Sequence, residues 1–171
     1  DRLLEHDDVR MLSFTGSTEV GRHLLERASR RVLRTAMELG GNAPFLVLGD
    51  ADIDAAVHGA LLAKMRNGGQ ACTAANRFYV HESIYAALAD ALAERMRSLH
   101  VGPASDASVD VGPLVNAESV SKVRELVEDA VRRGARVLTG GESPDGPGYF
   151  YPPTVLADVP EFKGEAPKPG S

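Results

Sequence analysis

The sequence has few of the residues that form disulfides, metal sites or membrane spans. Among its 171 residues it has one cysteine, no tryptophan and 5% aromatic residues. One cysteine cannot form an internal disulfide, and five scattered histidines lack the spacing of a zinc site, so we expect neither disulfide nor metal. No apolar run reaches the roughly 18 residues of a membrane span, and the charged start does not resemble a signal peptide. We therefore expect no membrane partner and a cytoplasmic location.

Charge and composition exclude two further classes of protein. The 19 Lys and Arg residues against 24 Asp and Glu residues give a net charge of -5, which is the wrong sign for binding nucleic acid. The chain is 43% hydrophobic and 25% charged, which is typical of a folded domain and excludes a disordered chain. Nucleic acid is therefore not the expected partner.

Short apolar segments alternate with amphipathic segments along the chain. Strands are expected at residues 9–14, 32–39, 44–48, 78–80 and 136–139. Helices are expected at residues 18–30, 53–65, 83–99 with Ser83 as the N-cap, and 120–131. Residues 149–156 contain two prolines, so any strand there lies at an edge or is interrupted. The alternation predicts an α/β fold with a mainly parallel sheet flanked by helices.

The first strand ends in a glycine-rich turn. Gly16 and Gly21 have the glycine spacing of a P-loop, but Arg22 and His23 stand where that motif needs Lys and then Ser or Thr. Nucleotide hydrolysis is therefore not expected. A Gly-Ser turn that opens a helix still directs backbone N–H groups and the positive end of the helix dipole outward, which suits a phosphate. An ordinary capped helix is the alternative interpretation.

Two residues are candidates for chemistry. Cys72 follows a double glycine and precedes small and polar residues, a setting that lets a ligand approach the thiol; a structural cysteine is the alternative. Glu38 lies near the C-terminal end of an expected strand, where α/β proteins place chemistry, although a solvated strand end is equally simple.

Three motifs in fixed order resemble those of the aldehyde dehydrogenase superfamily. They are Phe14-Thr15-Gly16-Ser17, Glu38-Leu39-Gly40-Gly41-Asn42 and Gly69-Gln70-Ala71-Cys72. The resemblance covers nearly all of residues 9–160, and the run at 65–77 looks most like that of bacterial succinate-semialdehyde dehydrogenases. It implies an aldehyde dehydrogenase-like α/β fold and oxidation of an aldehyde to a carboxylic acid with NAD or NADP.

The resemblance also implies roles for individual residues. Cys72 would attack the aldehyde, and Glu38 would be the general base that activates the water for hydrolysis of the thioester. Arg66 matches the arginine that holds the substrate carboxylate, which favours succinate semialdehyde or a similar short anionic semialdehyde; a surface arginine at a helix end is the alternative. The residues expected at the cofactor are Gly16, Ser17, Val20, Gly21 and Leu39.

The resemblance finally suggests a piece of a longer enzyme, incomplete at both ends. Residues 1–40 would end the NAD(P)-binding domain, 41–160 would form part of the catalytic domain, and 161–171 would be a tail or linker. The full-length parent is expected to be a homo-oligomer. The alternative is a truncated, non-catalytic fragment with idle motifs. An acylating relative that passes the thioester to coenzyme A is disfavoured by Glu38.

Overall fold

The computed structural model describes residues 2–160, which form two compact units. The first comprises residues 2–41 and the second residues 42–160. The tail or linker expected at residues 161–171 lies outside the described residues. The division falls between Gly41 and Asn42.

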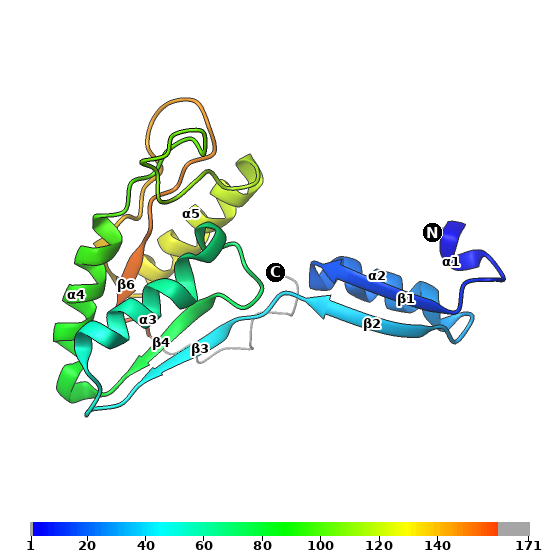
Figure 1. Ribbon diagram of the computed structural model, residues 1–171, viewed down its shortest axis with the longest axis horizontal. Coiled ribbons are helices and arrows are strands. Elements are labelled where there is room, and N and C mark those ends of the chain that lie inside the picture. The colour runs from blue at the N-terminus through cyan, green and yellow to red at the C-terminus, as the bar shows by residue number, and fades with distance from the viewer. Residues whose placement is uncertain (1, 161–171) are drawn as a thin grey trace. The chain divides into compact units, whose positions relative to one another are not determined.

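The first unit is a parallel strand pair joined by a helix (Figure 1). A short helix α1 (Arg2–Glu5) precedes β1 (Met11–Gly16), and α2 (Thr18–Ser29) connects β1 to β2 (Arg34–Leu39). The two strands pair in register along their whole length. Ala28 of α2 is 1% exposed, and it marks the face of the helix that packs against β1 and β2. The predicted strand-helix-strand order is confirmed here.

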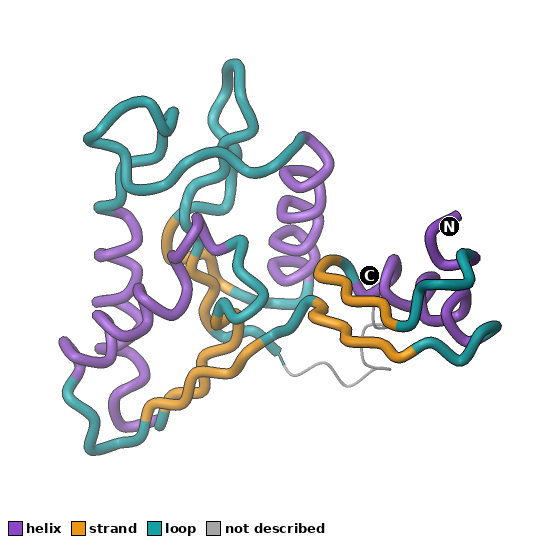
Figure 2. Tube along the Cα trace, turned by 45° about the vertical axis from the view of Figure 1, so that its right-hand side comes forward, coloured by secondary structure: helices purple, strands orange, loops and turns teal. Residues whose placement is uncertain are grey.

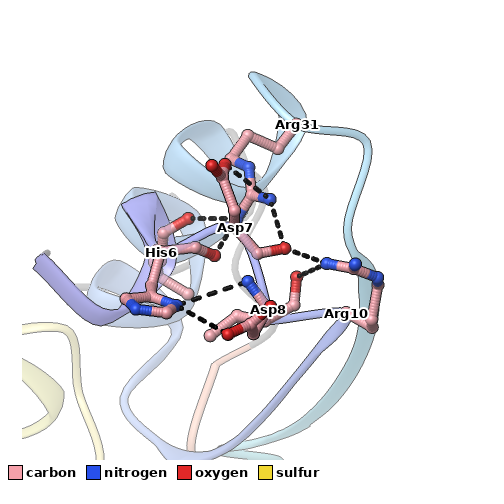
Figure 3. A network of polar contacts seen from close by, with 7 residues as sticks. His6, Asp7, Asp8, Arg10 and Arg31 are labelled. Atoms are coloured by element: carbon pink, nitrogen blue, oxygen red, sulfur yellow. Dashed lines mark hydrogen bonds and ion pairs between the residues drawn. The ribbon is translucent and has the colours of Figure 1, made fainter.

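Arg31 ties the turn after α2 to the N-terminal segment of the first unit (Figure 3). Its guanidinium donates hydrogen bonds to the backbone carbonyls of Leu4, His6 and Asp7 and lies 3.6 Å from the Asp7 carboxylate. The turn that positions Arg31 continues into Val32, which has a φ of 53° and an exposed fraction of 88%. The prediction that a strand begins at Val32 is therefore wrong, because a left-handed residue cannot extend a strand.

The second unit begins with another parallel strand pair joined by a helix. In it β3 (Ala43–Val47) leads to α3 (Ile53–Met65) and the short helix η1 (Arg66–Gly69), and β4 (Ala75–Val80) pairs with β3. Figure 2 shows the two strands side by side along their length. Asp52 caps α3 by accepting a hydrogen bond from the Ala55 N–H at 2.8 Å. The expected strand at residues 78–80 is confirmed, and it begins three residues earlier, at Ala75.

A second helix packs against α3 and completes the core of this unit. The 3-10 helix η2 (Glu82–Ile84) leads into α4 (Tyr85–Arg97). The core residues come from β3, α3 and α4, and are Val47, Val57, Ala60, Leu88, Leu92 and Met96. The prediction that Ser83 caps this helix is wrong. Ser83 lies inside η2, and the His81 ring nitrogen Nδ1 accepts its backbone N–H at 3.2 Å.

The last elements form an antiparallel pair. The helix α5 (Ala117–Arg132) is capped by Asn116 and is followed by β5 (Arg136–Thr139), which pairs with β6 (Val155–Ala157). The strand β6 has three residues, in agreement with the interruption expected at the prolines. Two of the three strand pairs among residues 2–160 are parallel, so the expected mainly parallel pairing is confirmed.

A polar triad holds β6 to its neighbours. Asp158 has a φ of 54°, and its carboxylate accepts hydrogen bonds from Tyr85 Oη at 2.9 Å and from Arg136 Nε at 2.6 Å. The Asp158 N–H also donates to Tyr85 Oη at 2.8 Å. The hydrogen bonds from Arg136 and Tyr85 lower the pKa of Asp158.

Asp158→Asn is expected to lower stability at neutral pH and to matter less in acid. A carboxyl whose pKa is lower in the folded state stabilises the fold above its unfolded pKa of about 3.9 and loses that contribution as the pH falls through the folded value. The measurement is the urea midpoint of wild type and variant between pH 7 and pH 3. The difference should shrink toward pH 3, whereas Asp145→Asn, at an exposed loop position, should show no such trend. A constant difference would rule out the ionised triad as its cause.

Candidate active site

The turn between β1 and α2 leaves backbone uncovered at a helix N-terminus. Ser17 is the N-cap: its Oγ accepts the Val20 N–H at 3.3 Å, and its carbonyl accepts the Gly21 N–H at 3.0 Å. Gly16 and Ser17 are both exposed. Gly16 has no side chain to cover this turn, and a Cβ at that position would lie 2.5 Å from Cζ of the Phe14 ring, so another residue would require the ring to move. The turn can therefore present backbone N–H groups and the positive end of the helix dipole to an anion.

Gly21 and Leu39 fix the approach of α2 to β2. Gly21 is buried, and a Cβ added to it would lie 2.7 Å from Leu39 Cδ2. The glycine thus lets the helix come close to the strand end. Both residues have this packing role in the structure. Their predicted contacts with a cofactor stay predictions, as does that of Val20, which is 45% exposed on α2.

Glu38 is the penultimate residue of β2 and is exposed. In the ladder it lies opposite Thr15, while Leu39 lies opposite Gly16. Because side chains alternate along a strand, Glu38 and Leu39 point to opposite faces. The packing of Leu39 against Gly21 therefore leaves the Glu38 carboxylate on the other face, in contact with water.

Cys72 lies on a loop that leaves α3 through an unusual turn. Three consecutive residues, Asn67, Gly68 and Gly69, have φ values of 52°, 62° and 80°. Two of them are glycine, which adopts this region without a steric penalty, and asparagine tolerates it better than most residues. The loop then forms a turn in which the Ala74 N–H donates to the Ala71 carbonyl at 2.9 Å. The thiol at the centre of that turn is free and exposed.

The Gln70 side chain ties this loop to a distant segment. Its amide nitrogen donates to the Pro113 carbonyl at 3.4 Å, and its amide oxygen accepts the Val115 N–H at 3.2 Å. One side chain thus contacts two backbone groups more than 40 residues away in sequence. This role of Gln70 was not predicted from the sequence, because periodicity carries no information about a pairing at that separation.

Lys64 and Asn76 close the same loop at its base. Lys64 Nζ donates to Asn76 Oδ1 at 2.6 Å, and burial lowers the pKa of the ammonium group. The two residues stand at the end of α3 and the start of β4, on either side of residues 66–74, which we call the cysteine loop. This pair was also not predicted from the sequence. A lysine within the apolar pattern of the α3 segment was the signal that could have indicated it.

Arg66 is exposed at the first residue of η1, directly after α3. Its guanidinium makes no hydrogen bond or ion pair with any other residue in the range 2–160. The same loop therefore presents a cationic side chain and a thiol to solvent. An uncompensated guanidinium on an exposed loop is suited to binding a carboxylate through two hydrogen bonds.

A cavity of about 460 Å³ lies within the second unit, next to the cysteine loop. Lys64, Gly69 and Gln70 contribute to its lining, but Arg66 and Cys72 do not. Most of the remaining lining is apolar and comes from β4, α4, α5 and the 151–156 segment. The cavity is therefore separate from the thiol and the guanidinium.

Residues 2–160 have neither a metal-binding cluster nor a membrane-spanning helix. Residues 2–160 hold no cluster of three or more His, Cys, Asp or Glu side chains able to bind a metal ion. No helix in this range combines the length and apolar character needed to cross a bilayer.

Comparison with known proteins identifies the family. The model of the aldehyde dehydrogenase family matches residues 1–164, almost the whole chain. The chain belongs to the aldehyde dehydrogenase family. It is 56% identical over 158 residues to the succinate-semialdehyde dehydrogenase of Paenarthrobacter nicotinovorans, covering 92% of this chain and 35% of that protein.

Two further relatives agree with this assignment. The succinate-semialdehyde dehydrogenase (NADP(+)) of Escherichia coli strain K12 is 49% identical, with 89% of this chain and 32% of that protein covered. The crystal structure of succinate-semialdehyde dehydrogenase from Burkholderia pseudomallei matches with a TM-score of 0.89 at 46% identity, covering 92% of this chain and 33% of that one. The aldehyde dehydrogenase-like α/β fold is thereby confirmed. The chain spans about a third of the length of these relatives.

Proposed function

We propose that the full-length protein containing this aldehyde dehydrogenase chain oxidises a short anionic semialdehyde to its carboxylic acid, with Cys72 as the nucleophile. The observation that carries the proposal is a free, exposed thiol on a loop held by side-chain ties at its base and near its tip. The names of the relatives support the substrate class, since two of them are succinate-semialdehyde dehydrogenases. The alternative is that this chain by itself is a truncated, non-catalytic fragment of such an enzyme with idle motifs.

The cofactor we propose is NAD or NADP, held in part by the first unit. The exposed turn at Gly16 and Ser17 fits a pyrophosphate, because it offers a helix N-terminus and has no side chain at position 16. Val20, Gly21 and Leu39 belong to the same proposed site. When bound, the oxidised nicotinamide supplies the hydride acceptor for the oxidation.

Cys72 carries out the covalent chemistry. Its thiolate attacks the aldehyde carbon, and the carbonyl oxygen takes up a proton to give a thiohemiacetal. Loss of a hydride and a proton from this species leaves a thioester on Cys72. The open loop gives the substrate access to the sulfur without displacement of a core residue.

Glu38 completes the cycle as a general base. Its carboxylate takes a proton from water as the water oxygen attacks the thioester carbon, and the Cys72 thiolate leaves with release of the acid. A carboxylate at an exposed strand end is in contact with the water that this step consumes. Coenzyme A as the acceptor would not need this base.

Arg66 selects the substrate. Its exposed guanidinium, on the same loop as Cys72, binds the distal carboxylate of the semialdehyde with two hydrogen bonds. A location in the cytoplasm and assembly into a homo-oligomer remain predictions made from the sequence.

Cys72→Ala in the full-length protein tests the central role. Aldehyde-dependent formation of reduced cofactor should fall by roughly 10³-fold or more, because the covalent route is lost. Thr73→Ala, at the exposed neighbouring position, is the matched control and should stay close to wild type. Turnover retained in Cys72→Ala would remove Cys72 as the nucleophile. A full-length wild type that is inactive with every semialdehyde tried would contradict the proposed activity.

Glu38→Gln should separate the two halves of the reaction. A general base contributes about 10² to 10⁴ in rate, and here only the hydrolysis step depends on it. Rapid mixing should show a burst of about one reduced cofactor per site followed by turnover slowed by roughly 10² or more. A burst rate that falls as much as the steady-state rate would instead assign Glu38 to the first half of the reaction.

Arg66→Leu should weaken discrimination for the anionic substrate. Hydrogen bonds to a charged group are worth about 1.5–3 kcal/mol, so kcat/KM for succinate semialdehyde should fall by roughly 10- to 100-fold. The value for an uncharged aldehyde of similar length should change by less than about threefold. Equal losses for both aldehydes would show that Arg66 supports the loop and does not bind the carboxylate.

A further inference from the structure

Lys64 is a charged side chain in a mostly apolar setting. It is half-buried on the last turn of α3 and lines the cavity next to the cysteine loop, together with apolar residues such as Phe78 and Leu92. No carboxylate in the range 2–160 pairs with its ammonium group. Removing a charge from water is costly without a partner, so packing alone would favour an uncharged side chain at this position.

The only hydrogen-bond partner of Lys64 within residues 2–160 is Asn76, at 2.6 Å. Lys64 lies just before the cysteine loop and Asn76 just after it, so this single hydrogen bond joins the two ends of the loop. A hydrogen bond from an ionised donor is stronger than one between neutral groups. The tie therefore helps to hold the two ends of the loop together.

The lysine stem also supports the loop from beneath. A Cβ on Gly69 would lie 3.1 Å from Lys64 Cε and 3.2 Å from its Nζ, so the backbone at Gly69 rests against the end of the lysine side chain. Gly69 is the last of the three residues with positive φ, and Cys72 follows shortly after. Lys64 thus contacts the loop at the point where the chain turns toward the thiol.

We propose that Lys64 is a positioning residue for Cys72, which acts through its hydrogen bond to Asn76 and its contact with Gly69. The inference deepens the proposed function and rests on the role of Cys72 as the nucleophile. Lys64 does not touch the reacting atoms. It holds the loop backbone so that the thiol meets the aldehyde in one geometry, and a displacement of about 1 Å at a reacting group can cost roughly 10²-fold in rate.

The test uses Lys64→Met in the full-length protein. Methionine keeps an unbranched side chain of similar length and removes the ammonium group. Hydrogen exchange measured by mass spectrometry over residues 66–77 should become about tenfold faster, because the Gln70 and Ala74 N–H groups are protected by hydrogen bonds inside the loop. We also expect kcat to fall about tenfold, while KM for the semialdehyde and for the cofactor changes by less than about twofold.

Two controls separate positioning from general stability. Lys122→Met removes an exposed lysine on α5 and should change neither exchange over 66–77 nor kcat. Asn76→Ala should match Lys64→Met, and the double variant should be no worse than either single variant, because both remove one interaction. Strictly additive losses, or faster exchange spread evenly over the whole protein, would overturn the proposal.

Failure of this inference is distinguishable from failure of the proposed function. Hydrogen exchange reports on the loop without reference to turnover, and Cys72→Ala reports on the nucleophile without reference to Lys64. Unchanged exchange and unchanged kcat in Lys64→Met would refute the positioning role even if Cys72→Ala were inactive. Full turnover in Cys72→Ala would refute it as well, since no nucleophile would remain for Lys64 to position.

Discussion

The turn at Asn67, Gly68 and Gly69 is the constraint on which the cysteine loop depends. Three successive residues with positive φ reverse the direction of the chain immediately after α3. Such a run is accessible only to residues that tolerate the left-handed region, which accounts for the double glycine and the asparagine before it. Arg66 precedes this turn and Gln70 follows it, so the turn sets the directions in which the chain enters and leaves this part of the loop.

A loop with this backbone needs to be held from outside, since it buries few side chains of its own. Ala74 and Ala75 are buried at its end, with exposed fractions of 2% and 3%. The rest of the support is polar: Gln70 contacts the 113–115 backbone, and Lys64 contacts Asn76. Hydrogen bonds fix direction as well as distance, whereas apolar contacts are non-directional. Polar support is therefore suited to a loop whose exposed thiol has to keep one orientation.

The sequence predicted which helices and strands form more accurately than it predicted the residues at which they begin. Period-four apolar spacing identified α3 and α5, because a buried helix face leaves that pattern directly in the chain. It failed at Val32, where apolar character suggested a strand and the structure has an exposed left-handed turn held by Arg31. It failed again at Ser83, where the His81 ring took the capping role that a serine usually fills. In both cases a side chain outside the pattern decided the boundary.

The candidate site shows the same division between local and distant information. The glycines, Cys72 and Glu38 were found because each belongs to a short motif. Lys64 and Gln70 were not, because their contacts become visible only when α3, β4 and the 113–115 segment are brought together. Burial then lowers the pKa of Lys64, a change that no local motif encodes. Partial burial of the Lys64 ammonium group is unfavourable, and a single amide oxygen is its partner. Core packing could be met by an uncharged side chain, so we attribute the lysine at this position to its support of the cysteine loop.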